Sequence, residues 1–92
     1  MATSVRIPSP MRQFTAGADQ LSLEGESVGA VLDNLLAQAS GLATRLFKPG
    51  TKTLNRNVNV YVNDEDIRFL QNLETPLKAG DVISIVPAIA GG

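Results

Sequence analysis

The sequence has 92 residues, 43% of them hydrophobic and 18% charged, with eight basic and nine acidic residues and a net charge of −1. This composition is typical of one folded domain, and the near-neutral charge argues against nucleic acid or an anionic membrane as a partner. Cysteine and histidine are absent, which excludes disulfides, thiolate nucleophiles, imidazole bases and nearly all transition-metal sites. Without an apolar leader or a run of about 18 apolar residues, a cytoplasmic protein is expected.

Two strands are predicted near the start of the sequence. Val5 and Ile7 alternate with polar residues until Pro8, which predicts a first strand because proline cannot donate a ladder hydrogen bond. Leu21 and Leu23 also alternate with polar residues and predict a second strand. A turn region lies between them, so the two strands are expected to pair antiparallel.

A helix is predicted after these strands. Ser27 can act as its N-cap, and helical spacing relates the apolar residues Val28, Val31, Leu32, Leu35 and Leu36. We expect a helix of about 14 residues with Gly41 at the C′ position just beyond its end. Three further apolar residues predict a short helical extension over the edge of the core: Leu42, Leu46 and Phe47.

The middle of the sequence combines a loop, a strand and a turn. Residues 48–57 are polar, contain proline and glycine, and predict an exposed loop. Residues 58–62 alternate valine with Asn59 and Tyr61, which is the strongest strand pattern in the chain. The "NDED" segment at 63–66 is expected to be a solvated turn rather than a metal site, because four consecutive residues lack the alternating ligand spacing of a calcium loop.

The last part of the domain is predicted to return to the sheet. Residues 67–69 are expected to form a short strand, and Leu73 and Leu77 to anchor the next segment in the core. A turn at 79–81 then leads into a final strand, "VISIV", that ends at Pro87.

The order of these elements predicts an α+β fold. Two strands, a helix and two or three further strands match a β-grasp, in which a mixed sheet of four to five strands packs on one main helix. We expect the domain to cover residues 1–87, followed by a flexible C-terminal tail at 88–92.

The sheet pattern also predicts an apolar strip facing away from the helix. If the valines of residues 58–62 face the helix, then Tyr61, Val82 and Val86 face outward. These side chains could contact a partner protein or simply stabilise the sheet, and both interpretations stay open. Arg68 is a further candidate for partner contact, with solubility as the simpler explanation.

The sequence ends in "PAIAGG", and this ending has two readings. Most chain termini fray and carry no function. Because glycine lacks Cβ, however, Gly91 and Gly92 can thread a narrow active site and present the carboxylate of Gly92 to a partner enzyme. In that interpretation Gly92 is itself a substrate.

Three segments together carry a family resemblance. "VNDEDIRF" at 62–69, "LKAGDVISIVP" at 77–87 and the final "AIAGG" resemble the ubiquitin-like sulfur carriers of the MoaD and ThiS families, and most closely the CysO-type carriers of cysteine biosynthesis. The resemblance implies that an E1-like enzyme adenylates Gly92, which is then converted to a thiocarboxylate. It also implies an arm that enters partner active sites, made of Ala88, Ile89, Ala90 and Gly91.

The same resemblance implies that the chain is a protein co-substrate and not an enzyme. No cofactor or metal is expected on the chain itself, because ATP and Mg²⁺ are used by the adenylating partner. The other implied partners are a sulfur donor and a sulfur-accepting synthase, either cysteine synthase-like or the large subunit of molybdopterin synthase. The free chain is expected to be a monomer.

Two other functions stay open at this point. One is the small subunit of molybdopterin synthase, and the other is a ubiquitin-like protein modifier or passive binding module. Ile89 and Ala90 occupy the place near the glycines where mature eukaryotic ubiquitin has an arginine. This difference argues against recognition by a ubiquitin ligase system, but an activated glycine could still acylate a lysine.

Overall fold

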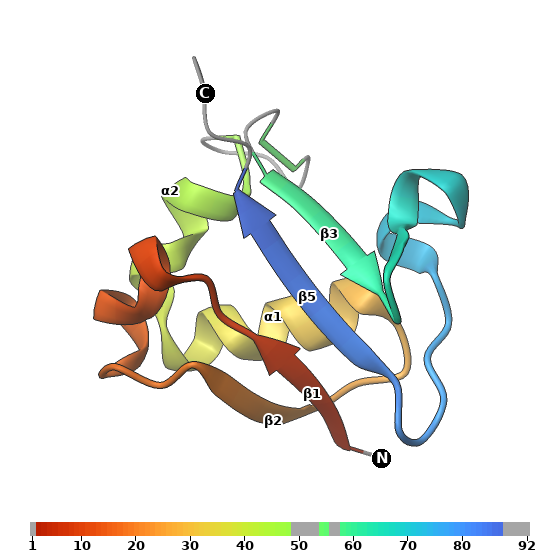
Figure 1. Ribbon diagram of the computed structural model, residues 1–92, viewed down its shortest axis with the longest axis horizontal. Coiled ribbons are helices and arrows are strands. Elements are labelled where there is room, and N and C mark those ends of the chain that lie inside the picture. Colours follow the sequence, from red (N-terminus) through yellow and green to blue (C-terminus); the bar gives the residue numbers. More distant parts are fainter. Residues whose placement is uncertain (1, 49–53, 56–57, 88–92) are drawn as a thin grey trace.

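Residues 2–48, 54–55 and 58–87 are described by the computed structural model, and within them a five-stranded sheet has the order β2-β1-β5-β3-β4. The strands are β1 (Ala2–Arg6), β2 (Gln20–Glu24), β3 (Val58–Val62), β4 (Glu65–Asp66) and β5 (Val82–Pro87). Helix α1 (Val28–Gln38) crosses behind this sheet (Figure 1). The predicted α+β architecture is therefore confirmed.

The strand pairing makes the sheet mixed. β1 pairs antiparallel with β2, as predicted, and parallel with β5. On its other side β5 pairs antiparallel with the whole length of β3, from Val58 opposite Pro87 to Val62 opposite Ile83. The first and last strands of the domain are thus neighbours at the centre of the sheet.

The inner face of the sheet packs on α1 and forms the core. Val5, Val60 and Ile83 are no more than 1% exposed. The buried residues of α1 are Val28, Val31, Leu32 and Leu35. The predicted N-cap is also confirmed, because the Ser27 hydroxyl accepts a hydrogen bond from the Ala30 N–H at 3.2 Å.

Helix α1 ends earlier than the sequence pattern predicts. It has 11 residues, and Ala39 follows its last turn. Gly41 lies instead within a short 3-10 helix, η2 (Ser40–Leu42), where a Cβ would stand 2.6 Å from Phe14 Cδ1. The C′ role assigned to Gly41 is therefore wrong, and glycine at this position leaves room for the Phe14 ring.

Among the described residues, no helix is long and apolar enough to cross a membrane.

Three short helical segments complete the core beyond α1. The predicted extension is confirmed, since η2 and α2 (Ala43–Leu46) lead into a set of buried side chains: Leu42, Leu46 and Phe47. A 3-10 helix, η1 (Ser9–Thr15), occupies the region predicted only as a turn and buries Met11. Proline at the start of η1 suits the first helical turn, because its fixed φ is compatible and its missing N–H is not needed there.

The loop predicted at 48–57 lies largely outside the described residues. Of its described part, Leu54 forms an isolated bridge with Phe47. The Asn55 amide donates to the carbonyls of Thr44 and Arg45 at 3.2 and 3.3 Å. Asn55 therefore satisfies carbonyl groups at the end of α2, which otherwise lack helical donors.

The turn after β3 is tighter than predicted. Asn63 and Asp64 have φ angles of 51° and 72°, the left-handed conformation expected at both central residues of a type I′ hairpin turn. Glu65 and Asp66 form β4 and pair with Val62 and Tyr61. Only the first half of the "NDED" segment is thus a turn.

The strand predicted at 67–69 is a 3-10 helix, η3 (Ile67–Phe69). The Asp66 carboxylate accepts the Arg68 N–H at 2.8 Å and caps this turn, which ends the strand pairing. Asp66 is only 7% exposed, so it does not belong to a solvated turn as the sequence suggested.

The segment that leads to β5 follows the prediction. After a short 3-10 helix, η4 (Asn72–Glu74), Leu77 is buried and Leu73 packs against the edge of the core. Gly80 has a φ of 89° in the predicted turn at 79–81, a conformation that other residues adopt only with strain. This turn sets the start of β5.

Candidate functional site

The predicted sulfur-carrying residue Gly92 and the arm at 88–91 lie outside the described residues. The domain is described up to Pro87, the last residue of β5, which lies opposite Val58 of β3. β5 has a strand on each side, β1 and β3. The strand that leads to the tail is therefore an internal strand of the sheet rather than an edge strand.

The outward face of the sheet, opposite α1, carries the predicted strip. Ser84 lies opposite Tyr61, and Val86 lies opposite Asn59. Tyr61 and Val82 are half-buried, whereas Val86 is 42% exposed. The alternation that placed these side chains outward is confirmed, while their contact with a partner stays a prediction.

The register adds a residue to this face that sequence reasoning missed. Arg6 of β1 lies beside Ser84 in the parallel pairing, so Arg6, Ser84 and Tyr61 form one row across three strands. Arg6, Ser84 and Tyr61 line a depression of about 470 Å³ together with Arg12 and Val86. Arg6 was already at an outward position of its predicted strand, but its proximity to Tyr61 depends on the pairing of β1 with β5.

The side chains of the two arginines that line this depression differ in their hydrogen bonding. Arg12 Nε donates to the Ile7 carbonyl at 3.0 Å, which holds its guanidinium near the rim. Arg6 is exposed and forms no side-chain hydrogen bond or ion pair with another described residue. Asp64 supplies a carboxylate to the lining and forms no ion pair with either arginine. The depression therefore has a net positive charge.

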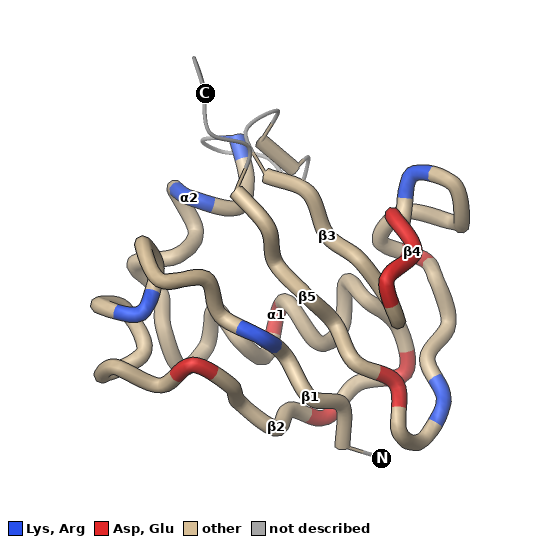
Figure 2. The backbone as a smooth tube through the Cα atoms, viewed as in Figure 1, with Lys and Arg blue, Asp and Glu red and all other residues tan. Residues whose placement is uncertain are grey.

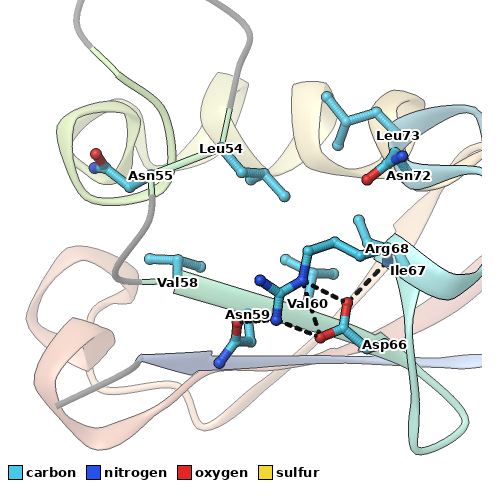
Figure 3. A pocket seen from close by; sticks show the side chains of 10 residues that line it. All are labelled: Leu54, Asn55, Val58, Asn59, Val60, Asp66, Ile67, Arg68, Asn72 and Leu73. Carbon is cyan, nitrogen blue, oxygen red and sulfur yellow. Dashed lines mark hydrogen bonds and ion pairs between the residues drawn. The ribbon is translucent and has the colours of Figure 1, made fainter.

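Arg68, the predicted partner contact, is already engaged within the chain. Its Nη2 lies 2.8 Å from Asp66 Oδ2 and donates to Asn59 Oδ1 at 2.9 Å (Figure 3). The hydrogen bond from the Arg68 side chain lowers the pKa of Asp66, and the same contact raises the pKa of Arg68. The Arg68 side chain is 63% exposed, but Asp66 compensates its charge.

An apolar cleft of about 360 Å³ lies beside the edge of β3 (Figure 3). Leu54, Val60 and Leu73 contribute to its lining, and the Asp66–Arg68 pair lies along it. Over the described ranges, no group of three or more histidine, cysteine or acidic side chains could hold a metal ion. None of the described residues that line this cleft is a nucleophile, and the one carboxylate among them, that of Asp66, is paired with Arg68.

The segments that carry the family resemblance include a hydrogen-bonded link between two turns. Asn63 Oδ1 accepts the Val82 N–H at 3.0 Å, and Asn63 Nδ2 donates to Asp81 Oδ1 at 2.8 Å. Asp81 Oδ2 accepts the Lys78 N–H at 2.8 Å. The hydrogen bond from the Lys78 main chain, followed by that from Asn63, lowers the pKa of Asp81. Part of this sequence pattern therefore has a structural role.

The sheet order, the helix across its inner face and the outward strip define a ubiquitin-like β-grasp domain. The sequence matches the ThiS family over residues 5–92. It is 44% identical over 93 residues to "Sulfur carrier protein CysO" of Mycobacterium tuberculosis, with all of both chains covered. The chain therefore belongs to the ThiS family.

Solved structures agree with this assignment and confirm the predicted β-grasp fold. A chain in the crystal structure of the Amycolatopsis orientalis BexX/CysO complex is 41% identical, with a TM-score of 0.88 over 99% of this chain and 100% of that chain. The solution structure of small archaeal modifier protein 1 from Methanosarcina acetivorans is 33% identical, with a TM-score of 0.88 over 99% and 96% of the two chains.

Proposed function

We propose that this chain is a sulfur carrier, a protein co-substrate of partner enzymes and not itself an enzyme. The observation that carries the proposal is the 44% identity to a CysO sulfur carrier along the whole of both chains. The ThiS family match supports it independently, because it extends from the first strand to the last residue of the sequence.

The chemistry proposed for Gly92 proceeds in two steps on partner enzymes. The Gly92 carboxylate first attacks the α-phosphate of ATP, which releases pyrophosphate and forms an acyl-adenylate. Hydrosulfide (HS⁻) supplied by the donor then attacks the carbonyl carbon of Gly92, so that a C–S bond forms, the C–O bond to AMP breaks, and a thiocarboxylate and free AMP result. Adenylation is needed because a free carboxylate is a poor electrophile, whereas AMP is a good leaving group. ATP and Mg²⁺ are bound by the E1-like partner.

The position of β5 supports this use of the tail. Its pairing with strands on both sides gives the tail a rigid base at Pro87. Five residues follow Pro87 in the sequence, and they reach at most about 18 Å when fully extended. That length is sufficient to bring Gly92 into an enclosed active site while the domain stays outside.

The outward strip is the proposed docking surface for the partners. Tyr61, Val82 and Val86 offer an apolar centre, and Arg68 lies at its edge beside Asn59. The proposed partners are the adenylating enzyme, the sulfur donor and a cysteine synthase-like acceptor. We prefer this acceptor to the large subunit of molybdopterin synthase because the similar sulfur carrier is a CysO. The A. orientalis CysO is found in a complex with BexX, so a similar domain does dock on another protein.

A protein modifier is the alternative function. It is favoured by the similarity to small archaeal modifier protein 1, because the same activated glycine could acylate a lysine side chain. The intact mass of the protein isolated from cells separates the two. A carrier gains the mass difference between sulfur and oxygen, whereas a modifier appears as isopeptide adducts.

Deletion of Gly92 and addition of one alanine after it test the proposal. Deletion withdraws the carboxylate by about 3.5 Å, and the extension places a Cβ beside the reacting carbon, so both should abolish adenylation. The measurement is carrier-dependent exchange of pyrophosphate into ATP by the cognate adenylating enzyme, with unfolding curves as the control for folding. Wild-type exchange by an alanine-extended protein of confirmed intact mass would exclude Gly92 as the acyl group.

A further inference from the structure

We propose that the depression lined by Arg6, Arg12 and Tyr61 binds carboxylate side chains of the adenylating enzyme and so guides the carrier onto it. This inference rests on the proposed function, because the partner is the enzyme that activates Gly92. It adds an electrostatic site to the apolar strip on the same face and names the partner chemistry that the site recognises.

The geometry of the site comes from three neighbouring strands. Ser84 of β5 lies between Arg6 of β1 and Tyr61 of β3, and its side chain is small, so the row is hollowed at its centre. Val86 lies on the same face of β5, one outward position closer to Pro87. A partner that covers this depression therefore also covers the end of the strand that leads to the tail.

The charge of the site indicates an acidic occupant. Arg6 has no side-chain partner among the described residues, and Arg12 uses only Nε in its hydrogen bond to Ile7. The guanidinium of Arg6 and the Nη groups of Arg12 thus stay available, whereas Arg68 at the other edge is paired with Asp66. In Figure 2 a basic position lies on β1, and acidic positions lie at β4 with a further basic position close by.

A carboxylate is the group that fits these donors. Guanidinium groups bind carboxylates through parallel, charge-assisted hydrogen bonds, and the hydroxyls of Ser84 and Tyr61 can donate further ones. A protein surface fits better than a free anion, because Pro8 and Val86 give the lining apolar parts that only a larger partner can cover. Paired charges at such an interface accelerate association and fix its orientation.

The test measures pyrophosphate exchange by the cognate adenylating enzyme as a function of carrier concentration. Arg6→Ala is the principal variant, because the Arg6 side chain forms no hydrogen bond with another described residue whose loss could disturb the fold. We expect the KM for the carrier to rise about fivefold or more, and further in Arg6→Glu, with kcat within about twofold of wild type. Arg12→Ala should act in the same direction. Lys78→Ala, an exposed cation on the loop before β5, is the matched control and should leave KM unchanged.

Salt provides a second readout. Added NaCl should raise the KM of the wild type more steeply than that of Arg6→Ala, because the variant has lost a screened charge pair. If the wild type exchanges pyrophosphate but neither arginine substitution changes KM or its salt dependence, the inference is wrong and the carrier function stands. If the wild type itself supports no exchange, the proposed function fails and the inference fails with it.

Discussion

The inner and outward faces of the sheet are formed by alternate residues of the same strands, but their side chains have different roles. On the inner face of β3 and β5, Val60 and Ile85 are nearly inaccessible to water. On the outward face of the same strands, Tyr61 is half-buried and Val86 is 42% exposed. The stability of the domain is therefore concentrated on one face, which leaves the other available for contacts that a partner completes.

The largest effect is expected on the inner side, at Leu35 of α1. Leu35→Ala removes a fully buried side chain and should lower the free energy of unfolding by about 2 to 5 kcal/mol, through lost transfer energy and a cavity. Chemical denaturation measures this change. A loss below about 1 kcal/mol would contradict the assignment of Leu35 to the core.

The inner face was also the part of the fold that the sequence predicted best. Val58, Val60 and Val62 had to share one face because side chains alternate along a strand, and burial of that face determined the register. The errors occurred where a contact of one particular side chain decides the conformation. Glycine is needed at position 41 because the Phe14 ring lies against it, and the 3-10 turn after β4 forms because the Asp66 carboxylate accepts the Arg68 N–H. Neither contact has a periodic signal in the sequence.

The link between the turns belongs to neither face, and its loss should cost less than a core truncation. Asn63→Ala removes hydrogen bonds to the Val82 N–H and to Asp81, and should lower the free energy of unfolding by about 1 to 2 kcal/mol. Asn63→Gly is the matched control, because glycine loses the same hydrogen bonds but tolerates the positive φ at this position. An unchanged stability in Asn63→Gly would assign the effect to backbone strain alone.

On the outward face, a substitution should weaken binding to a partner without disrupting the fold. Tyr61→Ala should weaken binding to the adenylating enzyme by about 1 kcal/mol or more, as expected for an aromatic side chain near an interface centre. Its fold should persist, because Tyr61 is half-buried and lies on the face away from α1. Isothermal calorimetry measures the affinity and circular dichroism the fold. An unchanged affinity would leave Tyr61 with a role in sheet packing only.

The candidate site was only partly predictable. Alternation alone placed Tyr61 and Val86 outward, since it needs no knowledge of the neighbouring strand. The proximity of Arg6 to Tyr61 could not be derived in this way, because it requires the parallel pairing of the first strand with the last. Arg68 is exposed, as both partner contact and solubility require, but its ion pair with Asp66 depends on the local 3-10 turn, which the sequence pattern did not predict.

The smallest expected effect is a pH dependence from the two hydrogen-bonded carboxylates. The pKa values of Asp66 and Asp81 are lowered in the folded protein, by the Arg68 side chain and by the Lys78 N–H respectively. As the pH falls below about 4, the unfolded chain therefore takes up protons at these residues before the folded chain does. Their stabilisation is fully present above this pH and is lost as the pH falls through the lowered folded-state pKa values.

The double variant Asp66→Asn, Asp81→Asn isolates this contribution from that of the other carboxylates. It should be less stable than the wild type at pH 7, but it should lose less stability on acidification. Chemical denaturation at a series of pH values from about 7 to 2.5 gives, for each protein, the slope of the free energy of unfolding against pH. The difference should be modest, because water screens the charge of the exposed Arg68 side chain. Equal slopes in the two proteins would show that neither carboxylate has a different pKa in the folded and the unfolded chain.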